Sequence, residues 1–213
     1  MSEIIEQGSA AWYEQRLGRV TASRVADIVA RTKSGYSTSR ANYLAELLVE
    51  RLSGQRAESF VSAAMQWGTD QESEARMAYM FRTDSDVELA GFVAHPTIEM
   101  SGASPDGYVG ADGLVEFKCP NTATHIETLL TGVIPGRYET QMFWQMACTG
   151  RAWCDFASFD PRMPEEMRLF VKRVPRDDAR VAELEEEVRT FLFELDTTVR
   201  RLVKAYGVER AAA

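Results

Sequence analysis

The sequence predicts an α/β (α+β) protein in which a mixed central β-sheet is flanked by helices. Helical periodicity dominates the first third, short β segments bounded by Gly and Pro begin at Val87, and a long amphipathic helix closes the chain. The chain shows no internal repeat and no low-complexity tract. We therefore expect a single domain over residues 1–213, with its sheet at about 87–174 and its last helix at about 177–206.

The first third of the chain predicts three helices. Ser23 is placed to cap a helix that ends near Ala30, and a second helix is expected from about Arg40 to Leu52. A third should run from about Ser62 to Phe81. The inward face of the second helix is expected to carry Leu44, Leu47, Leu48 and Val49.

The middle of the chain changes to β-strand patterns. The segments VELAGFVAH, TIEMSGASPDGYV and LVEFK follow Val87, and the turn GADG between Val109 and Leu114 predicts a hairpin. Helices are then expected at about 122–131 and 137–149, followed by the strands WCDFASF and RLFVKRV, which the turn DPRMPEE joins. The last helix carries an apolar stripe at i, i+3/i+4 spacing, which is typical of core packing: Val181, Leu184, Val188, Phe191, Leu195, Val199, Leu202 and Tyr206.

Composition predicts a cytoplasmic protein of ordinary solubility. The chain is 45% hydrophobic and 26% charged, and it has neither a basic signal-peptide start nor a long apolar run. Its three cysteines are too few and too scattered for a disulfide framework or a Cys-x-x-Cys metal site. The net charge of −8 argues at first sight against nucleic acid. However, residues 61–112 concentrate nine acidic and two basic side chains, which indicates either a solvated surface or a cation site.

Two carboxylates and one ammonium are predicted to meet in the β region. Side chains alternate along a strand, so Glu116 and Lys118 share one face. If the chain reverses near residues 110–113, Asp106 lies on the partner strand opposite about Lys118 and within diagonal reach of Glu116. The competing interpretation is a simple strand ion pair between Glu116 and Lys118.

Buried like charges imply a cation. A divalent ion would neutralise the two carboxylates, and ligation by oxygen alone favours Mg²⁺ or Mn²⁺ over zinc. Such an ion can polarise a phosphoryl oxygen and lower the pKa of bound water, which is what phosphodiester hydrolysis needs. Lys118 beside it could orient or deprotonate the attacking water and offset negative charge. The chain has no Gly-rich phosphate loop, so we do not expect ATP to be used.

The arrangement D-x9-E-x-K, with Pro105 before Asp106, resembles the PD-(D/E)xK nuclease core, and this resemblance implies a restriction-endonuclease-like fold. The wider pattern resembles the lambda exonuclease / YqaJ family of viral-type recombination nucleases, because five separated motifs occur in the same order. They are WYEQRLGRVTAS from Trp12, Gln66-Trp67-Gly68 with Glu72, Glu116-Phe117-Lys118-Cys119-Pro120, Tyr138 with Gln141, and Asp160-Pro161-Arg162-Met163.

The resemblance implies roles at the metal centre. Asp106, Glu116 and the Phe117 carbonyl would bind metal, and Lys118 would activate water. Glu72 would hold a second metal or a bridging water, although it could equally be a solvated helix glutamate. Gln141 would position the nucleophilic water, the alternative being a polar stripe over the core. Two Mg²⁺ ions are expected, with Mn²⁺ able to substitute.

The resemblance also implies a 5′-phosphate site. Arg16, Ser23 and Ser104 match the residues that bind the 5′-phosphate of the strand being degraded, and a guanidinium suits this task because it grips phosphate with two charged donors. For Ser23 the alternative is a plain helix cap. Trp12 is expected in the core or against a DNA base, and Arg137 is a further DNA-binding candidate.

Together these features predict a Mg²⁺-dependent exonuclease that degrades the 5′-phosphorylated strand of duplex DNA from 5′ to 3′. The remaining 3′ single strand would serve recombination by single-strand annealing. The resemblance implies a homotrimeric ring around DNA ends, an annealing-protein partner and a bacterial, phage or prophage origin, with no role for a membrane. The alternatives are an endonuclease on the same core and a non-catalytic module that binds DNA ends. An iron–sulfur nuclease would need four clustered cysteines.

Overall fold

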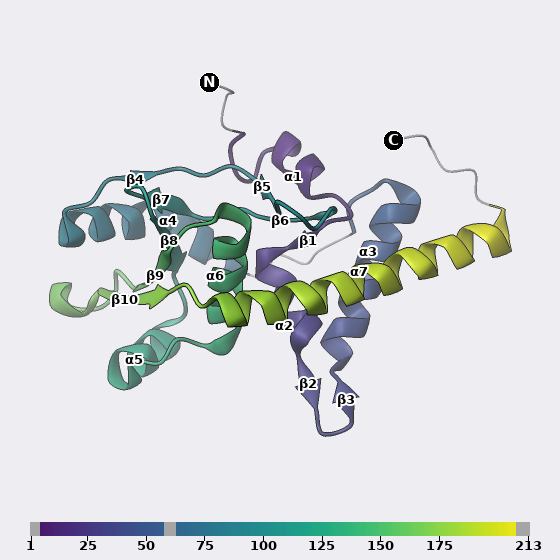
Figure 1. Cartoon of the computed structure of the whole chain (residues 1–213). Coiled ribbons are helices and arrows are strands. Elements are labelled where there is room, and N and C mark those ends of the chain that lie inside the picture. Colours follow the sequence, from purple (N-terminus) through teal and green to yellow (C-terminus); the bar gives the residue numbers. More distant parts are fainter. Residues whose placement is uncertain (1–4, 58–62, 208–213) are drawn as a thin grey trace.

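A five-stranded mixed sheet, called the central sheet because helices cover both of its faces, lies in the left part of Figure 1. The computed structural model describes residues 5–57 and 63–207. The strand order is β10-β9-β8-β7-β4, in which β8 and β9 run parallel and the other neighbours are antiparallel. The strands are β4 (Val87–Glu88), β7 (Gly107–Val109), β8 (Gly113–Lys118), β9 (Trp153–Phe159) and β10 (Leu169–Pro175). The predicted fold class and the predicted hairpin between β7 and β8 are both confirmed.

Two smaller sheets lie beside the central one. One has the order β1-β6-β5, with β1 parallel to β6, and the other is the β2–β3 hairpin. Their strands are β1 (Val20–Thr21), β2 (Arg31–Thr32), β3 (Gly35–Tyr36), β5 (Val93–Ala94) and β6 (Ser101–Ala103). The prediction of one sheet over residues 87–174 was therefore wrong for residues 93–103. These residues pair with the N-terminal strand β1, a contact between distant parts of the chain that local patterns do not reveal.

Helices cover both faces of the central sheet. On one face, Ala75 and Tyr79 of α4 pack against Val115 and Phe117 of β8. On the other, α6 packs against α2 and α7 over Leu114 and other residues of the main apolar core. The helices are α1 (Ala10–Arg16), α2 (Ala22–Val29), α3 (Thr38–Ser53), α4 (Ala63–Thr83), α5 (Thr122–Thr131), α6 (Gly136–Thr149) and α7 (Asp178–Tyr206), with a short 3₁₀ helix, η1 (Glu165–Met167). Alternating side chains of β8 thus serve two different layers.

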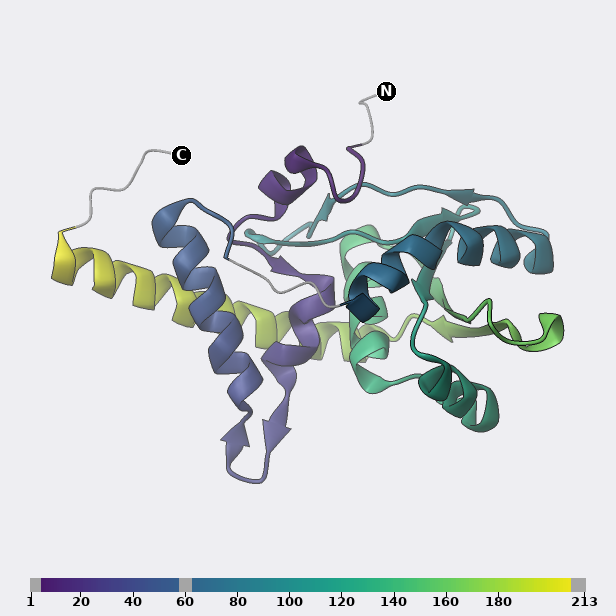
Figure 2. The same ribbon diagram turned by 180° about the vertical axis from the view of Figure 1, so that it is seen from behind.

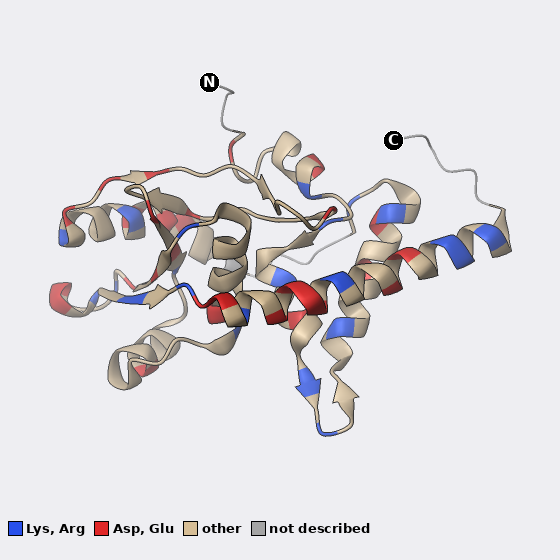
Figure 3. Ribbon diagram, in the orientation of Figure 1, with Lys and Arg blue, Asp and Glu red and all other residues tan. Residues whose placement is uncertain are grey.

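The long helix α7 crosses α3, and both extend beyond the sheet (Figure 2). Arg40 Nη1 on α3 pairs with Glu194 at 2.6 Å, and Arg31 Nη2 on β2 pairs with Glu187 at 2.6 Å. Asp177 caps α7 by accepting from the amides of Ala179 and Arg180. Acidic side chains lie toward the start of α7 and basic ones toward its end, which complements the helix dipole (Figure 3).

Most predicted helices and strands are confirmed within a few residues, but the helix α1 and the short strands β1, β2 and β3 were not predicted. Two local predictions were also wrong. Thr21, not Ser23, occupies the N-cap of α2, and Ser23 lies exposed in the first turn. Val49 is 53% exposed, because α3 buries a narrower face than predicted. The predicted start of the third helix, Ser62, lies outside the described residues. None of the helices in residues 5–57 and 63–207 combines the length and apolar character needed to cross a membrane.

Candidate active site

The β7–β8 hairpin places Asp106 beside Glu116. In this ladder Gly107 pairs with Val115, so the next position back brings Asp106 to the level of Glu116. The Phe117 amide donates to Asp106 Oδ2 at 2.7 Å. The prediction that Asp106 faces Lys118 was wrong by two residues, because the chain reverses one residue earlier, over residues 110–112.

Glu116 is the buried centre of the candidate site. Its side chain is fully buried, and both carboxylate oxygens accept hydrogen bonds from α6. Gln141 Nε2 donates to Oε1 at 2.6 Å, and Gln145 Nε2 donates to Oε2 at 2.5 Å. Lys118 Nζ forms an ion pair with Oε1. The two glutamines are four residues apart, so they lie one helical turn from each other on the same face. The structure therefore gathers Asp106, Glu116, Lys118 and Gln141, as predicted from the sequence.

The electrostatics of this cluster favour a cation. Burial, then the charges of Glu116 and Glu72, raise the pKa of Asp106 well above its usual value. Burial, then Glu116, also raises the pKa of Glu72. Burial works to lower the pKa of Lys118, but the facing carboxylates of Glu116 and Asp106 raise it overall. Three carboxylates thus face a single ammonium in a poorly solvated place, which is the electrostatic environment that a divalent ion relieves.

The donor set fits a hard cation, with a small number of side-chain ligands. Within the described ranges, no three His, Cys, Asp or Glu side chains converge closely enough to hold a metal by themselves. The predicted site then consists of the Asp106 and Glu116 carboxylates and the Phe117 carbonyl, with Glu72 further out on α4. The ring of Phe117 packs edge-on against Tyr79 on the other face, so the main chain is the part of Phe117 available to the site. All these donors are oxygens, as Mg²⁺ and Mn²⁺ prefer.

Four motif residues without an assigned role, in α4 and after β9, lie where α4 approaches the end of β8. The guanidinium of Arg162 lies 4.2 Å from the centre of the Trp67 ring. Its Nε donates to the buried carboxylate of Asp160 at 2.7 Å. At Gly68, an added methyl group would lie 3.5 Å from the Cys119 carbonyl oxygen, which shows how closely α4 approaches this strand end. Glu72 lies one turn further along the same helix.

A second cluster lies two residues upstream of Asp106. Trp12 Nε1 donates to Ser104 Oγ at 2.9 Å, and Arg16 Nη1 donates to the same oxygen at 3.3 Å. The Arg16 guanidinium lies 4.0 Å from the centre of the Trp12 ring, and burial lowers its pKa. Arg16 and Ser23 line a cavity of about 260 Å³ between α1, α2 and α3. The residues predicted for the 5′-phosphate thus lie in one neighbourhood, although Ser23 reaches it from inside α2 and not as a cap.

The cavity holds basic side chains that the sequence did not single out. Arg19, Arg24 and Arg56 line it together with Arg16. Arg24 is already neutralised by Asp27 and Glu46, at 2.7 Å from each. Arg19 lies in the same RLGRVTAS segment as Arg16, so the sequence motif could have predicted that Arg19 lies near the site. Gln145, the second donor to Glu116, was signalled by its helical spacing from Gln141.

Arg137 lies exposed at the start of α6, and its Nη2 donates to the hydroxyl of Tyr138 at 2.6 Å. Its guanidinium lies 4.5 Å from the centre of the Tyr138 ring, and Lys118 Nζ lies 5.1 Å from the same ring centre. Arg137 is thus connected to the carboxylate cluster through Tyr138 and Lys118, and its contact with DNA stays a prediction.

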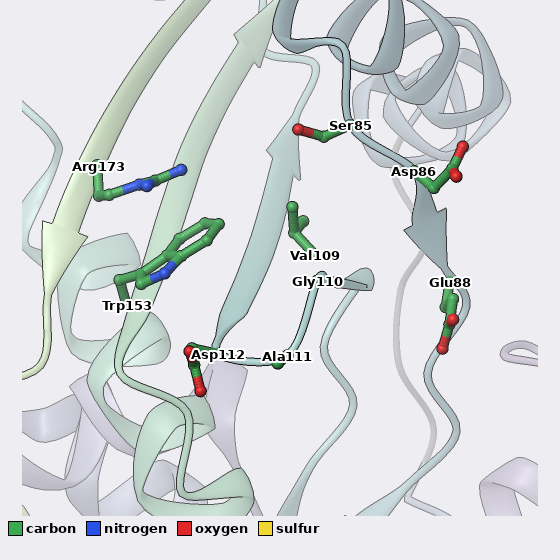
Figure 4. A pocket seen from close by; sticks show the side chains of 9 residues that line it. All are labelled: Ser85, Asp86, Glu88, Val109, Gly110, Ala111, Asp112, Trp153 and Arg173. Carbon is green, nitrogen blue, oxygen red and sulfur yellow. The ribbon is translucent and has the colours of Figure 1, made fainter.

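A larger cavity, of about 590 Å³, lies at the other end of the β7–β8 hairpin. Asp86, Glu88 and Asp112 line it, together with Trp153 and Arg173 (Figure 4). None of the predicted site residues is among its lining, so size alone does not identify the site of chemistry here.

The cysteines and histidines have structural positions. Cys119, Cys148 and Cys154 are free thiols, and burial, then the nearby carboxylates, raises the pKa of Cys119 to about 12. His125 is fully buried, and its ring nitrogens contact Ser158 Oγ and the Met167 carbonyl, each at 2.8 Å. His95 is buried and stacks on Trp144. Cys148, Cys154 and the two histidines are therefore held within the core, and Cys119 lies partly buried at its edge.

Comparison with protein families matches residues 11–152 to the YqaJ-like viral recombinase domain. Among solved structures, the alkaline exonuclease LHK-Exo from Laribacter hongkongensis is 49% identical, with a TM-score of 0.87 over 93% of this chain and 98% of that chain. The same protein in complex with dAMP gives a TM-score of 0.88 over the same shares. A phage-related exonuclease from Haemophilus somnus 129PT is 16% identical, with a TM-score of 0.69 over 86% of this chain and 96% of that chain, and at this identity it shows the fold alone. A comparison with curated proteins gives no match.

Proposed function

The chain belongs to the YqaJ-like viral recombinase domain family and is a nuclease, and from this premise we propose that it is a Mg²⁺-dependent DNA exonuclease. It would degrade the 5′-phosphorylated strand of duplex DNA from 5′ to 3′ and leave a 3′ single strand for recombination by single-strand annealing. The relationship to an alkaline exonuclease at 49% identity supports the exonuclease class.

One observation carries the polarity. The carboxylates that would bind a cation and the side chains that would bind a terminal phosphate are joined through Ser104-Pro105-Asp106. Arg16 and Trp12 contact Ser104, and Asp106 contacts the main chain beside Glu116. A site with these two parts can hold the 5′ end of a strand while a nearby phosphodiester is hydrolysed.

Each side chain has a chemical task in this proposal. Asp106, Glu116 and the Phe117 carbonyl would hold one Mg²⁺, and Glu72 would help hold a second ion directly or through water. The metal, when bound, supplies Lewis-acid stabilisation of the phosphate and a more acidic water. Lys118 orients the attacking water and offsets the negative charge that develops on the phosphoryl oxygens. Gln141 holds Glu116 through Nε2 and leaves its amide oxygen to accept from that water.

The phosphate-binding side chains act on the substrate end. The Arg16 guanidinium supplies charged donors, and the hydroxyls of Ser104 and Ser23 supply neutral ones. The Trp12 ring, stacked under Arg16, keeps the guanidinium in place.

The test uses linear duplex DNA with a 5′-phosphate, the same duplex with a 5′-hydroxyl, and a closed circle, each with and without Mg²⁺. We expect fast digestion only of the strand that carries the 5′-phosphate. The reaction should require Mg²⁺, and Mn²⁺ should be able to replace it. Cutting of the closed circle would instead identify an endonuclease. Binding of DNA ends with no hydrolysis under any of these conditions would identify a non-catalytic end-binding module.

The partners follow from the family resemblance. We propose a homotrimeric ring that encloses the duplex, because enclosure would hold DNA even though the chain carries a net charge of −8. A single-strand annealing protein would bind the 3′ single strand. The reaction would take place in the bacterial cytoplasm, and the gene would belong to the bacterium, to a phage or to a prophage. Light scattering of the purified protein gives the mass that tests the ring.

A further inference from the structure

Gln145 contacts the catalytic carboxylate from a position that substrate cannot reach. Its side chain is fully buried, and its Nε2 lies 2.5 Å from Glu116 Oε2. Gln141, which donates to Oε1, is by contrast 9% exposed. Any influence of Gln145 on the reaction therefore passes through Glu116.

The amide of Gln145 has a fixed orientation. An ionised carboxylate only accepts hydrogen bonds, so the amide nitrogen must face Glu116. The amide oxygen then faces the Cys154 thiol on β9, with 3.9 Å between Cys154 Sγ and Gln145 Oε1. Gln145 is thus held between two neighbouring strands and cannot rotate without leaving one contact unmade.

The two glutamines together define the plane of the Glu116 carboxylate. One donor on each oxygen, from residues one helical turn apart, resists rotation about the bond that joins the carboxylate to its side chain. Lys118 also pairs with Oε1, so of these three side chains Gln145 alone donates to Oε2. Without Gln145, Oε2 would lose this donor, and the carboxylate would be held at one oxygen instead of two.

We propose that Gln145 is a positioning residue that fixes the Glu116 carboxylate for cation binding. This inference rests on the proposed function, because it assumes that Glu116 is a metal ligand. Groups that orient a metal ligand in this way are typically worth about 10- to 100-fold in metal affinity.

The experiment measures Mn²⁺ binding by titration calorimetry and by electron paramagnetic resonance, with no DNA present. The variants are Gln145→Met, which keeps the length and removes the donor, and Gln145→Asn, which keeps the amide but is too short to reach Oε2. Met142→Ala is the matched control, because Met142 is fully buried on the same helix, belongs to the apolar core and has no polar group to offer Glu116. It should destabilise α6 without affecting the carboxylate.

We expect Gln145→Met to weaken Mn²⁺ binding by about 10- to 100-fold and Gln145→Asn to weaken it measurably. Binding of 5′-phosphorylated duplex without divalent ions should stay at the wild-type level, and saturating Mn²⁺ should restore most of the turnover. Wild-type affinity in both Gln145 variants, or an equal loss in Met142→Ala, would overturn the inference while the proposed metal site stands. If the wild-type protein itself binds no Mn²⁺, the proposed function fails and this inference fails with it.

Discussion

Replacing Arg16 by Ala should remove the preference for a 5′-phosphate and leave the chemistry intact. The guanidinium donates to Ser104 Oγ at 3.3 Å and stacks on Trp12, so it is already oriented before any substrate arrives. A charged hydrogen bond to phosphate is worth about 1.5–3 kcal/mol, and each 1.4 kcal/mol is about a factor of ten. The rate ratio between 5′-phosphorylated and 5′-hydroxyl duplex should therefore fall by about 10- to 150-fold. The lost contact with Trp12 affects both substrates equally, so it cancels in this ratio.

The assay compares kcat/KM on two duplexes that differ in the terminal phosphate alone. Arg24→Ala is the control, because Arg24 lines the same cavity but is already neutralised by Asp27 and Glu46. This variant should keep the wild-type ratio. Arg16→Ala should also shorten the tract degraded per binding event, measured with a trap for released enzyme. If Arg16→Ala slows both duplexes by one factor and leaves the tract length unchanged, the phosphate site is wrongly placed and Arg16 is a structural residue.

The other predictions concern the carboxylate cluster. Lys118→Ala should lower the rate of hydrolysis of both duplexes by about 10²-fold or more and leave DNA binding unchanged, because the ammonium acts mainly in the transition state. The control, Lys172→Ala at an exposed position, should change neither the rate nor the binding. Near wild-type turnover in Lys118→Ala would remove Lys118 from the mechanism. Asp106→Asn should weaken Mg²⁺ binding measured by calorimetry, and unchanged affinity would contradict the assigned site. The raised pKa values of Asp106 and Glu72 mean that the folded metal-free protein holds protons which the unfolded chain has lost, so its stability should fall as pH rises above about 4. Thermal melts should show this fall reduced in Asp106→Asn, and Mg²⁺ should stabilise the wild type more at pH 8 than at pH 5; a metal-free melting curve that Asp106→Asn leaves unchanged at every pH would refute the reasoning.

The sequence predicted the elements that depend on neighbouring residues. The Asp106, Glu116 and Lys118 cluster comes from one hairpin, and alternation along a strand is a local rule. The predicted register of the β7–β8 hairpin was wrong by two residues. Register depends on where the chain reverses, and the sequence GADG allows more than one position for the turn. The helix cap was also local, but Thr21 and Ser23 are both acceptable capping residues, so composition did not decide between them.

The contacts between distant segments could not be predicted in this way. The parallel pairing joins Val20 to Ser101, and the helices α3 and α4 lie between these two residues in the sequence. No pattern in either strand specifies its partner. The same holds for Gln145, since helical spacing shows that it shares a face with Gln141 but not which carboxylate that face meets. The cavity behind Arg16 combines residues of three helices, so Arg56 could enter it only through tertiary packing.

The connection between β6 and β7 explains how end recognition and hydrolysis could be coupled. β6 belongs to the three-stranded sheet and β7 to the five-stranded sheet, so residues 104–106 pass from one to the other. The Cα atoms of Ser104 and Asp106 are at most about 7 Å apart, since each trans peptide spans about 3.8 Å. Gln7 Nε2 holds this segment by donating to the Pro105 carbonyl at 2.8 Å. In the proposed function, a phosphate bound at Ser104 and a cation bound at Asp106 would therefore lie close together, and a strand end anchored there would present a nearby phosphodiester to the carboxylates. An enzyme built to cut inside a duplex has no need of such short spacing, which is why this segment favours exonucleolytic over endonucleolytic action.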